Sequence, residues 1–170
     1  IMNQSWDTLI ILDACRFDDF KQYNQISGDL DCVISKGVDS AEFIRENFTG
    51  KRFPDTIYVT ANPHVYLIND DIFHEIISDP ISNWDQELKC VKPSDVATAA
   101  IDAHQKYPNK RIIIRFMQPH DPPLGETGQK LRDRYEINGP QSTDNRVMEL
   151  VAEGIISEQM ARKAYRETLK

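Results

Sequence analysis

The sequence predicts an α/β protein with a mostly parallel sheet flanked by helices. Two short apolar runs carry this prediction: Leu9 to Leu12, which stops at Asp13, and Arg111 to Met117, which precedes a Pro-rich turn. Runs of this length suit strands that are buried on both faces of a parallel sheet. Segments with helical patterning lie between the strand-like runs, and this alternation is typical of parallel α/β architecture.

The elements follow from local signals along the chain. Strands are expected over 6–13, 31–35, 56–60 and 111–117, and helices over 16–23, 40–48, 94–107, 147–153 and 157–170. The 56–60 strand is β-branched and aromatic, and the 94–107 helix is framed by Pro93 and Pro108. Residues 63–92 are interpreted as an irregular insertion over one end of the sheet, with a candidate helix near 70–77, and 125–143 as a polar loop.

Length and composition predict a single globular domain over 1–170. The chain is 40% hydrophobic and 28% charged, and no apolar stretch approaches the ~20 residues that a membrane span requires. The formal net charge of -7 argues against a nucleic-acid backbone as the main partner. It leaves room for a substrate that carries phosphate, because the local field matters more than the net charge.

The three cysteines, Cys15, Cys32 and Cys90, have the spacing of neither a zinc knuckle nor a redox pair. An odd number of cysteines without a framework favours a reducing compartment, so a cytoplasmic location is expected. Cys15 follows the end of the first expected strand. It is either a reactive thiol or a small buried hydrophobic side chain.

Polar residues follow the carboxyl ends of the expected strands, where ligands bind in open α/β sheets. Asp13 with Arg16 follows the first strand, and His120 with Asp121 follows the last. A third polar segment, Ser35 to Glu42, lies between the second strand and its helix. We expect these three segments to converge on one edge of the sheet.

Ser40 and Asp13 each have a functional interpretation and a structural one. Ser40 is expected at the N-cap of a helix, where an anion is favoured; it is either a nucleophile facing a phosphate or a plain cap. A metal that lowers its pKa would let the hydroxyl attack a phosphoryl or sulfuryl centre. Asp13 either ligates a divalent metal, or pairs with Arg16 or caps the next helix.

His120 and Arg16 also have a functional interpretation and a structural one each. His120 either donates a hydrogen bond to a substrate oxygen or ligates a metal, or it is a structural residue of a Pro-rich loop. Arg16 either binds an oxyanion through both guanidinium nitrogens or pairs with Asp18 or Asp19.

Three segments in order resemble the alkaline phosphatase-like superfamily, on its sulfatase-like side. They are I-I-L-D-A-C-R-F-D (10–18), S-K-G-V-D-S-A-E-F (35–43) and R-F-M-Q-P-H-D-P-P (115–123). The resemblance covers roughly residues 6–62 and 94–125. It implies the corresponding α/β fold and a hydrolase or transferase that acts on phosphate or sulfate esters through a covalent seryl intermediate.

Carried over to this chain, the resemblance makes Asp13 a metal ligand and Ser40 both metal ligand and nucleophile. His120 stabilises charge on the substrate oxygens. Arg16 is expected to bind substrate because of its guanidinium and its place after the first strand, not because of the resemblance. The implied cofactor is a divalent metal, Mn²⁺, Zn²⁺ or Mg²⁺, acting as a Lewis acid.

The chain departs from the family pattern in three places. It has no C/S-x-P-x-R motif, which argues against formylglycine sulfatase chemistry. Asp13 is followed by Ala14, where sulfatases often have a second acid, and the chain has no Asp-His-Gly, which supplies further metal ligands in the family. The domain is therefore expected to be incomplete at its carboxyl end. The alternative is a non-catalytic sulfatase-like domain that serves binding or assembly. An uncovered sheet edge would then favour a homo-oligomer.

Overall fold

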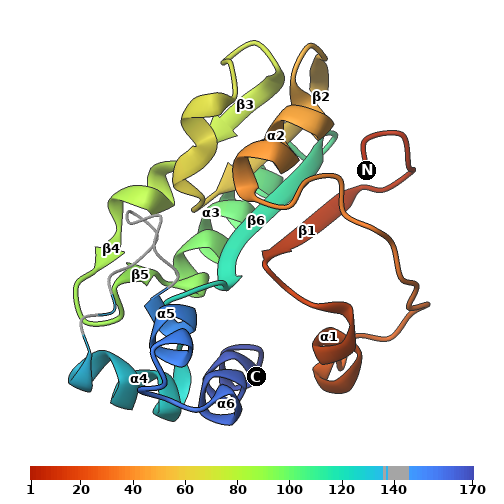
Figure 1. Ribbon diagram of the computed structural model, residues 1–170. Coiled ribbons are helices and arrows are strands. Elements are labelled where there is room, and N and C mark those ends of the chain that lie inside the picture. The colour runs from red at the N-terminus through yellow and green to blue at the C-terminus, as the bar shows by residue number, and fades with distance from the viewer. Residues whose placement is uncertain (136, 138–145) are drawn as a thin grey trace. The chain divides into compact units, whose positions relative to one another are not determined.

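A computed structural model describes residues 1–135, 137 and 146–170, and the chain forms two compact units (Figure 1). Unit 1 comprises residues 1–11, 33–83 and 91–116, and unit 2 comprises 12–32, 84–90 and 117–170. Strands β1 (Thr8–Asp13) and β6 (Arg111–Pro119) begin in unit 1 and end in unit 2.

The sheet has four strands in the order β1-β6-β2-β3, with β2 at Phe53–Thr60 and β3 at Phe73–Ile77. It is parallel: β2 pairs in parallel with β6, with Tyr58 opposite Ile113, and with β3, with Tyr58 opposite Ile76. Helices flank it, so the predicted α/β class with a mostly parallel sheet is confirmed.

Helices α2 (Ser40–Phe48) and α3 (Pro93–Lys106) lie on opposite faces of this sheet (Figure 1). Because strand side chains alternate between faces, Tyr58 and Ile113 point to the α2 face, where they form a core with Phe48 and Phe73. The ring of Phe48 meets those of Phe73 and Tyr58 edge-on, with centroids 5.2 and 5.7 Å apart. These rings anchor α2 on the sheet.

Unit 2 is mainly helical. Its helices are α1 (Phe17–Tyr23), α4 (Gly125–Arg134), α5 (Arg146–Ala152) and α6 (Glu158–Thr168). Its core includes Leu131 of α4, Leu150 of α5 and Ala164 of α6, all 3% exposed or less. Glu167 of α6 accepts hydrogen bonds from the backbone and the hydroxyl of Thr127, which ties α6 to the start of α4.

The remaining elements are short. They are the 3-10 helices η1 (Pro63–Leu67) and η2 (Asp79–Ser82), and the strands β4 (Trp84–Asp85) and β5 (Cys90–Val91), which form a two-stranded sheet. Within the described ranges, no helix has the length and apolar character needed to cross a membrane.

Three predicted elements are wrong. Residues 31–35 form no strand; Val33 and Ile34 are 80% and 97% exposed, because no neighbouring strand pairs with them. The candidate helix near 70–77 is instead β3, a full member of the sheet, so 63–92 is not simply an irregular insertion. Residues 125–134 form helix α4, although a polar loop was expected over 125–143. Residues 136 and 138–143 of that expected loop lie outside the described residues.

Candidate functional site

Ser40 opens helix α2 in unit 1, but it is not the N-cap that the sequence predicted. Asp39 takes that place, because its carboxylate accepts a 2.7 Å hydrogen bond from the backbone N–H of Glu42, which also holds the pKa of Asp39 below its usual range. Ser40 is therefore the first helical residue. Its side chain is not required for capping and is available for other contacts.

Two donors converge on the Ser40 hydroxyl. Asn62 Nδ2 lies 3.0 Å and Arg115 Nη2 lies 2.8 Å from Ser40 Oγ. Since both groups can only donate, the serine oxygen accepts from both. A guanidinium cation at this distance stabilises negative charge on that oxygen and so lowers the free-energy cost of forming an alkoxide.

Arg115 comes from the middle of β6 and is 2% exposed. Its guanidinium carbon lies 5.2 Å from the centre of the Phe43 ring. Arginine is almost never fully buried unless it is paired, so the hydrogen bond to Ser40 is part of the network that holds this cation in the strand. The sequence carries this signal, since Arg115 interrupts the apolar run between Ile114 and Phe116, but the local pattern does not indicate a partner for the cation.

Asn62 follows the carboxyl end of β2 and is 1% exposed. Its Oδ1 accepts from the backbone N–H of His64 at 2.8 Å and lies 3.2 Å from His64 Nδ1. These contacts fix the amide so that Nδ2 points at Ser40. The break at Asn62-Pro63 was visible in the sequence, but its link to Ser40 was not, because 22 residues separate the two.

In unit 2, the turn after β1 holds Asp13 and Arg16. Ala14 adopts a left-handed backbone conformation, with φ of 59°. The Tyr165 hydroxyl of α6 donates to Ala14 O at 3.0 Å and accepts from Arg16 N at 2.9 Å, and burial raises the pKa of Tyr165 to about 12. One side chain of the last helix thus fixes the turn between the predicted metal ligand and the predicted substrate-binding residue.

His120 follows β6 and belongs to the same unit. Its backbone N–H donates to Asp13 O at 3.1 Å, and its Nδ1 lies 3.0 Å from Asp121 O. A carbonyl oxygen only accepts, so this contact places the proton of the neutral ring on Nδ1 and leaves Nε2 with a lone pair. His120 Nε2 is therefore equipped to take up a proton or to bind a metal.

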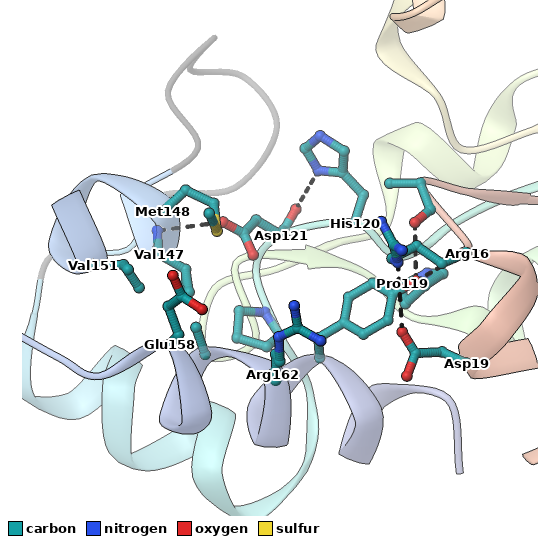
Figure 2. A pocket seen from close by; sticks show the side chains of 14 residues that line it. Arg16, Asp19, Pro119, His120, Asp121, Val147, Met148, Val151, Glu158 and Arg162 are labelled. Carbon is teal, nitrogen blue, oxygen red and sulfur yellow. Dashed lines mark hydrogen bonds and ion pairs between the residues drawn. The ribbon is translucent and has the colours of Figure 1, made fainter. Parts of the chain in front are cut away.

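Arg16 and His120 both line one pocket of unit 2, with a volume of about 350 Å³ (Figure 2). Arg16 is also engaged in the ion pair that the sequence offered as its alternative, with Nε and Nη2 at 3.1 and 3.3 Å from the Asp18 carboxylate. Asp18 is itself exposed, so this pair competes only weakly with a bound anion.

Of the four predicted site residues, Asp13, Arg16 and His120 belong to unit 2 and Ser40 belongs to unit 1. The alternative nucleophile Cys15 is disfavoured, because burial raises the pKa of its thiol, whereas reactive cysteines have a lowered pKa. Among residues 1–135, 137 and 146–170, no three His, Cys, Asp or Glu side chains are grouped to hold a metal ion.

Searches with this chain against protein-family models, curated proteins and solved structures returned no significant match. The resemblance to the alkaline phosphatase-like superfamily accordingly remains a prediction from the three sequence segments.

Proposed function

We propose that this protein is a hydrolase or transferase of the alkaline phosphatase-like type, which acts on phosphate or sulfate esters with Ser40 as nucleophile. The observation that supports this proposal best is the 2.8 Å contact between Ser40 Oγ and the guanidinium of Arg115, which is 2% exposed. A buried cation beside a hydroxyl stabilises the alkoxide that attacks, and it attracts the anionic ester to the same place.

The proposed reaction has two steps. Ser40 Oγ forms a bond to phosphorus or sulfur while the bond to the substrate alcohol breaks, and the alcohol leaves with the proton that the Ser40 hydroxyl gives up. Water, or an acceptor alcohol in the transferase case, then attacks the seryl ester, takes the phosphate or sulfate group and returns a proton to Ser40 Oγ. The role that the resemblance gives His120, stabilising charge on the substrate oxygens, stays a prediction, because His120 belongs to unit 2 and Ser40 to unit 1.

The resemblance further assigns a divalent metal to Asp13 and Ser40. The described residues contain no three-donor group, so these two residues alone do not make a tight site, and no step of the proposed reaction is routed through the ion. The proposed reaction is therefore tested with each metal ion and with a chelator.

The test compares wild type with Ser40→Ala on aryl phosphate monoesters, aryl phosphate diesters and aryl sulfates, in Mn²⁺, Zn²⁺, Mg²⁺ or chelator. Loss of a catalytic nucleophile is expected to lower turnover by about a thousandfold or more. The matched control is Ser94→Ala, since Ser94 is an exposed serine in the first turn of α3. Mass spectrometry of the quenched wild-type reaction is expected to find the transferred group on the peptide that contains Ser40.

The alternative is a non-catalytic domain that serves binding or assembly. The observation in its favour is that Ser40 Oγ already accepts two internal hydrogen bonds, as a purely structural serine would. Equal turnover by wild type and Ser40→Ala, or no turnover under any metal condition, would reject the proposed enzyme and favour this second function.

A further inference from the structure

The pocket of unit 2 has an apolar side, to which helix α5 contributes most. Val147, Met148 and Val151 of α5 line this side, together with Ala161 of α6. Figure 2 shows the three α5 side chains gathered at one side of the pocket, whereas His120 lies at the other. An aliphatic wall of this kind favours a ligand that carries an apolar group.

Several charged groups that line the pocket are already compensated within unit 2. The guanidinium of Arg16 pairs with the Asp18 carboxylate, and Asp19 pairs with Arg166, whose Nε lies 2.7 Å from Asp19 Oδ1. Burial raises the pKa of the Asp121 carboxyl group, which disfavours its charged form. These groups therefore offer little net charge to a ligand.

Glu158 and Arg162 of α6 differ from these groups. Both line the pocket, and their spacing of four residues places them on the same face of the helix. Within residues 1–135, 137 and 146–170, neither side chain takes part in an ion pair or a hydrogen bond. Figure 2 shows both side chains extending from α6 on the side that faces α5. The pocket thus presents one anion and one cation, a helical turn apart, beside its apolar side.

This pair of opposite charges decides the class of ligand. A ligand with an anionic group alone would be attracted by Arg162 and repelled by Glu158, and a ligand with a cationic group alone would meet the reverse. A zwitterion compensates both charges. The Cβ atoms of residues i and i+4 in a helix are roughly 5–6 Å apart, so the two side chains can reach an ammonium and a carboxylate that are attached to the same carbon atom.

We propose that this pocket binds a free α-amino acid with an apolar side chain. Its carboxylate lies at Arg162, its ammonium group at Glu158 and its side chain against α5. The volume of about 350 Å³ suits such a ligand, because a cavity of roughly 150 Å³ already holds benzene. This ligand site goes beyond the proposed function and does not depend on it, since Ser40 belongs to unit 1 and the ligand is not an ester.

The first test compares leucine with three compounds that each lack one of its parts. Glycine lacks the apolar side chain, 4-methylpentanoate lacks the ammonium group and 3-methylbutylamine lacks the carboxylate. Each compound is titrated into the full chain labelled with ¹³C at the methionine methyl groups and followed by NMR. Leucine is expected to shift the Met148 signal and to bind about tenfold or more tightly than each of the other three.

Met160 of α6 is the internal reference of this titration. It is 44% exposed, similar to the 54% of Met148, but it does not line the pocket. Its signal is expected to stay in place while that of Met148 shifts, which distinguishes binding in the pocket from a general effect of the added compound.

The second test removes each charge in turn. Arg162→Met is expected to weaken leucine binding about tenfold or more and to abolish the preference for leucine over 3-methylbutylamine. Glu158→Gln is expected to weaken it similarly and to abolish the preference for leucine over 4-methylpentanoate. Lys163→Met and Glu126→Gln are the matched controls. Both residues are exposed and do not line the pocket, so each change should alter affinity less than twofold.

A preference for leucine that requires both Glu158 and Arg162 would support the site. Absence of a Met148 shift, or equal affinities for leucine and glycine, would overturn it. Equal affinities for leucine and 4-methylpentanoate, unchanged by Glu158→Gln, would also overturn it, because the pocket would then recognise only an anion. Since none of the four compounds is a phosphate or sulfate ester, each outcome stands whether or not turnover depends on Ser40.

Discussion

At the scale of single residues, Arg115 has no conservative replacement. Its planar guanidinium presents several donors in fixed directions, so Nη2 reaches Ser40 Oγ while the same group lies over the Phe43 ring. A lysine ammonium is a compact, strongly hydrated charge that cannot fill both roles. Its desolvation in a strand core would also be costly. The proposed chemistry of Ser40 therefore depends on arginine at this position.

Asp121 makes the stability of the fold depend on pH. Burial raises the pKa of its carboxyl group in the folded state, so between the ordinary and the raised value the folded protein binds more protons than the unfolded one. Stability contributed by this group is accordingly present at low pH and lost as pH rises through that window.

We therefore predict that Asp121→Asn is more stable than wild type at pH 7, since the amide oxygen can still accept from Val147 N. The difference in the free energy of unfolding is expected to shrink as pH falls towards the ordinary pKa of an aspartate. Urea unfolding of both proteins at a series of pH values measures it. A difference that is constant with pH would contradict the assignment.

At the scale of elements, the errors of sequence interpretation have physical causes. Residues 31–35 have β-branched side chains, but a strand needs a partner, and Ile34 is 97% exposed without one. The F-H-E-I-I segment of β3 is only five residues long, and a local pattern does not distinguish a strand from a helical segment at this length. Its pairing with β2, with Glu75 opposite Ile57, is a long-range property that a local pattern does not carry.

Helix α4 is not predictable from its sequence, G-E-T-G-Q-K-L-R-D-R, because this segment is almost entirely polar and contains two glycines. Leu131 is the only large apolar residue in it that is buried, and the helix depends on the contacts of Thr127 with Glu167 of α6. By contrast, α2, α3 and β6 were predictable, since each carries its own apolar periodicity or run.

The site was only partly predictable for the same reason. Ser40 and His120 stood out because each lies in a short motif, whereas Asn62, Arg115 and Arg162 gain their meaning from tertiary contacts. A residue whose partners lie 22 or 75 positions away in the chain leaves no local signature.

Helix α6 is predicted to stabilise the turn after β1 through one hydroxyl. Tyr165→Phe keeps the ring but leaves Ala14 O and Arg16 N without their shared partner, which should cost about 1–3 kcal/mol of unfolding free energy. Tyr23→Phe is the control, because the Tyr23 ring contacts Lys170 and no hydrogen bond of its hydroxyl is found among the described residues. Equal stability of the two variants in urea unfolding would contradict this role.

At the scale of the whole molecule, the two units share one continuous chain. It passes between them after residues 11, 32, 83, 90 and 116, and both β1 and β6 continue across the boundary. Neither unit is a contiguous segment of the chain, so we do not expect one unit to unfold without disturbing the other. We therefore expect a single cooperative transition.

The two tryptophans test this expectation, since Trp6 belongs to unit 1 and Trp84 to unit 2. Phe48→Ala in the core of unit 1 should cost about 3–5 kcal/mol. The Phe48→Ala substitution should lower the midpoint of unfolding by the same amount for both fluorescence probes. Trp6 is read in a Trp84→Phe background, and Trp84 is read in a Trp6→Phe background. A Trp84 midpoint that stays in place would mean that the units unfold independently.

Strand β6 also limits how this sequence can change in length during evolution. Loss of one residue between Ile112 and Ile114 would turn Arg115 from the α2 face to the α3 face and move its cation away from Ser40. Residues 24–39 contain neither helix nor strand, so they can lengthen or shorten without such an effect. Insertions and deletions in descendants of this chain should therefore collect between α1 and α2, while β6 keeps its length.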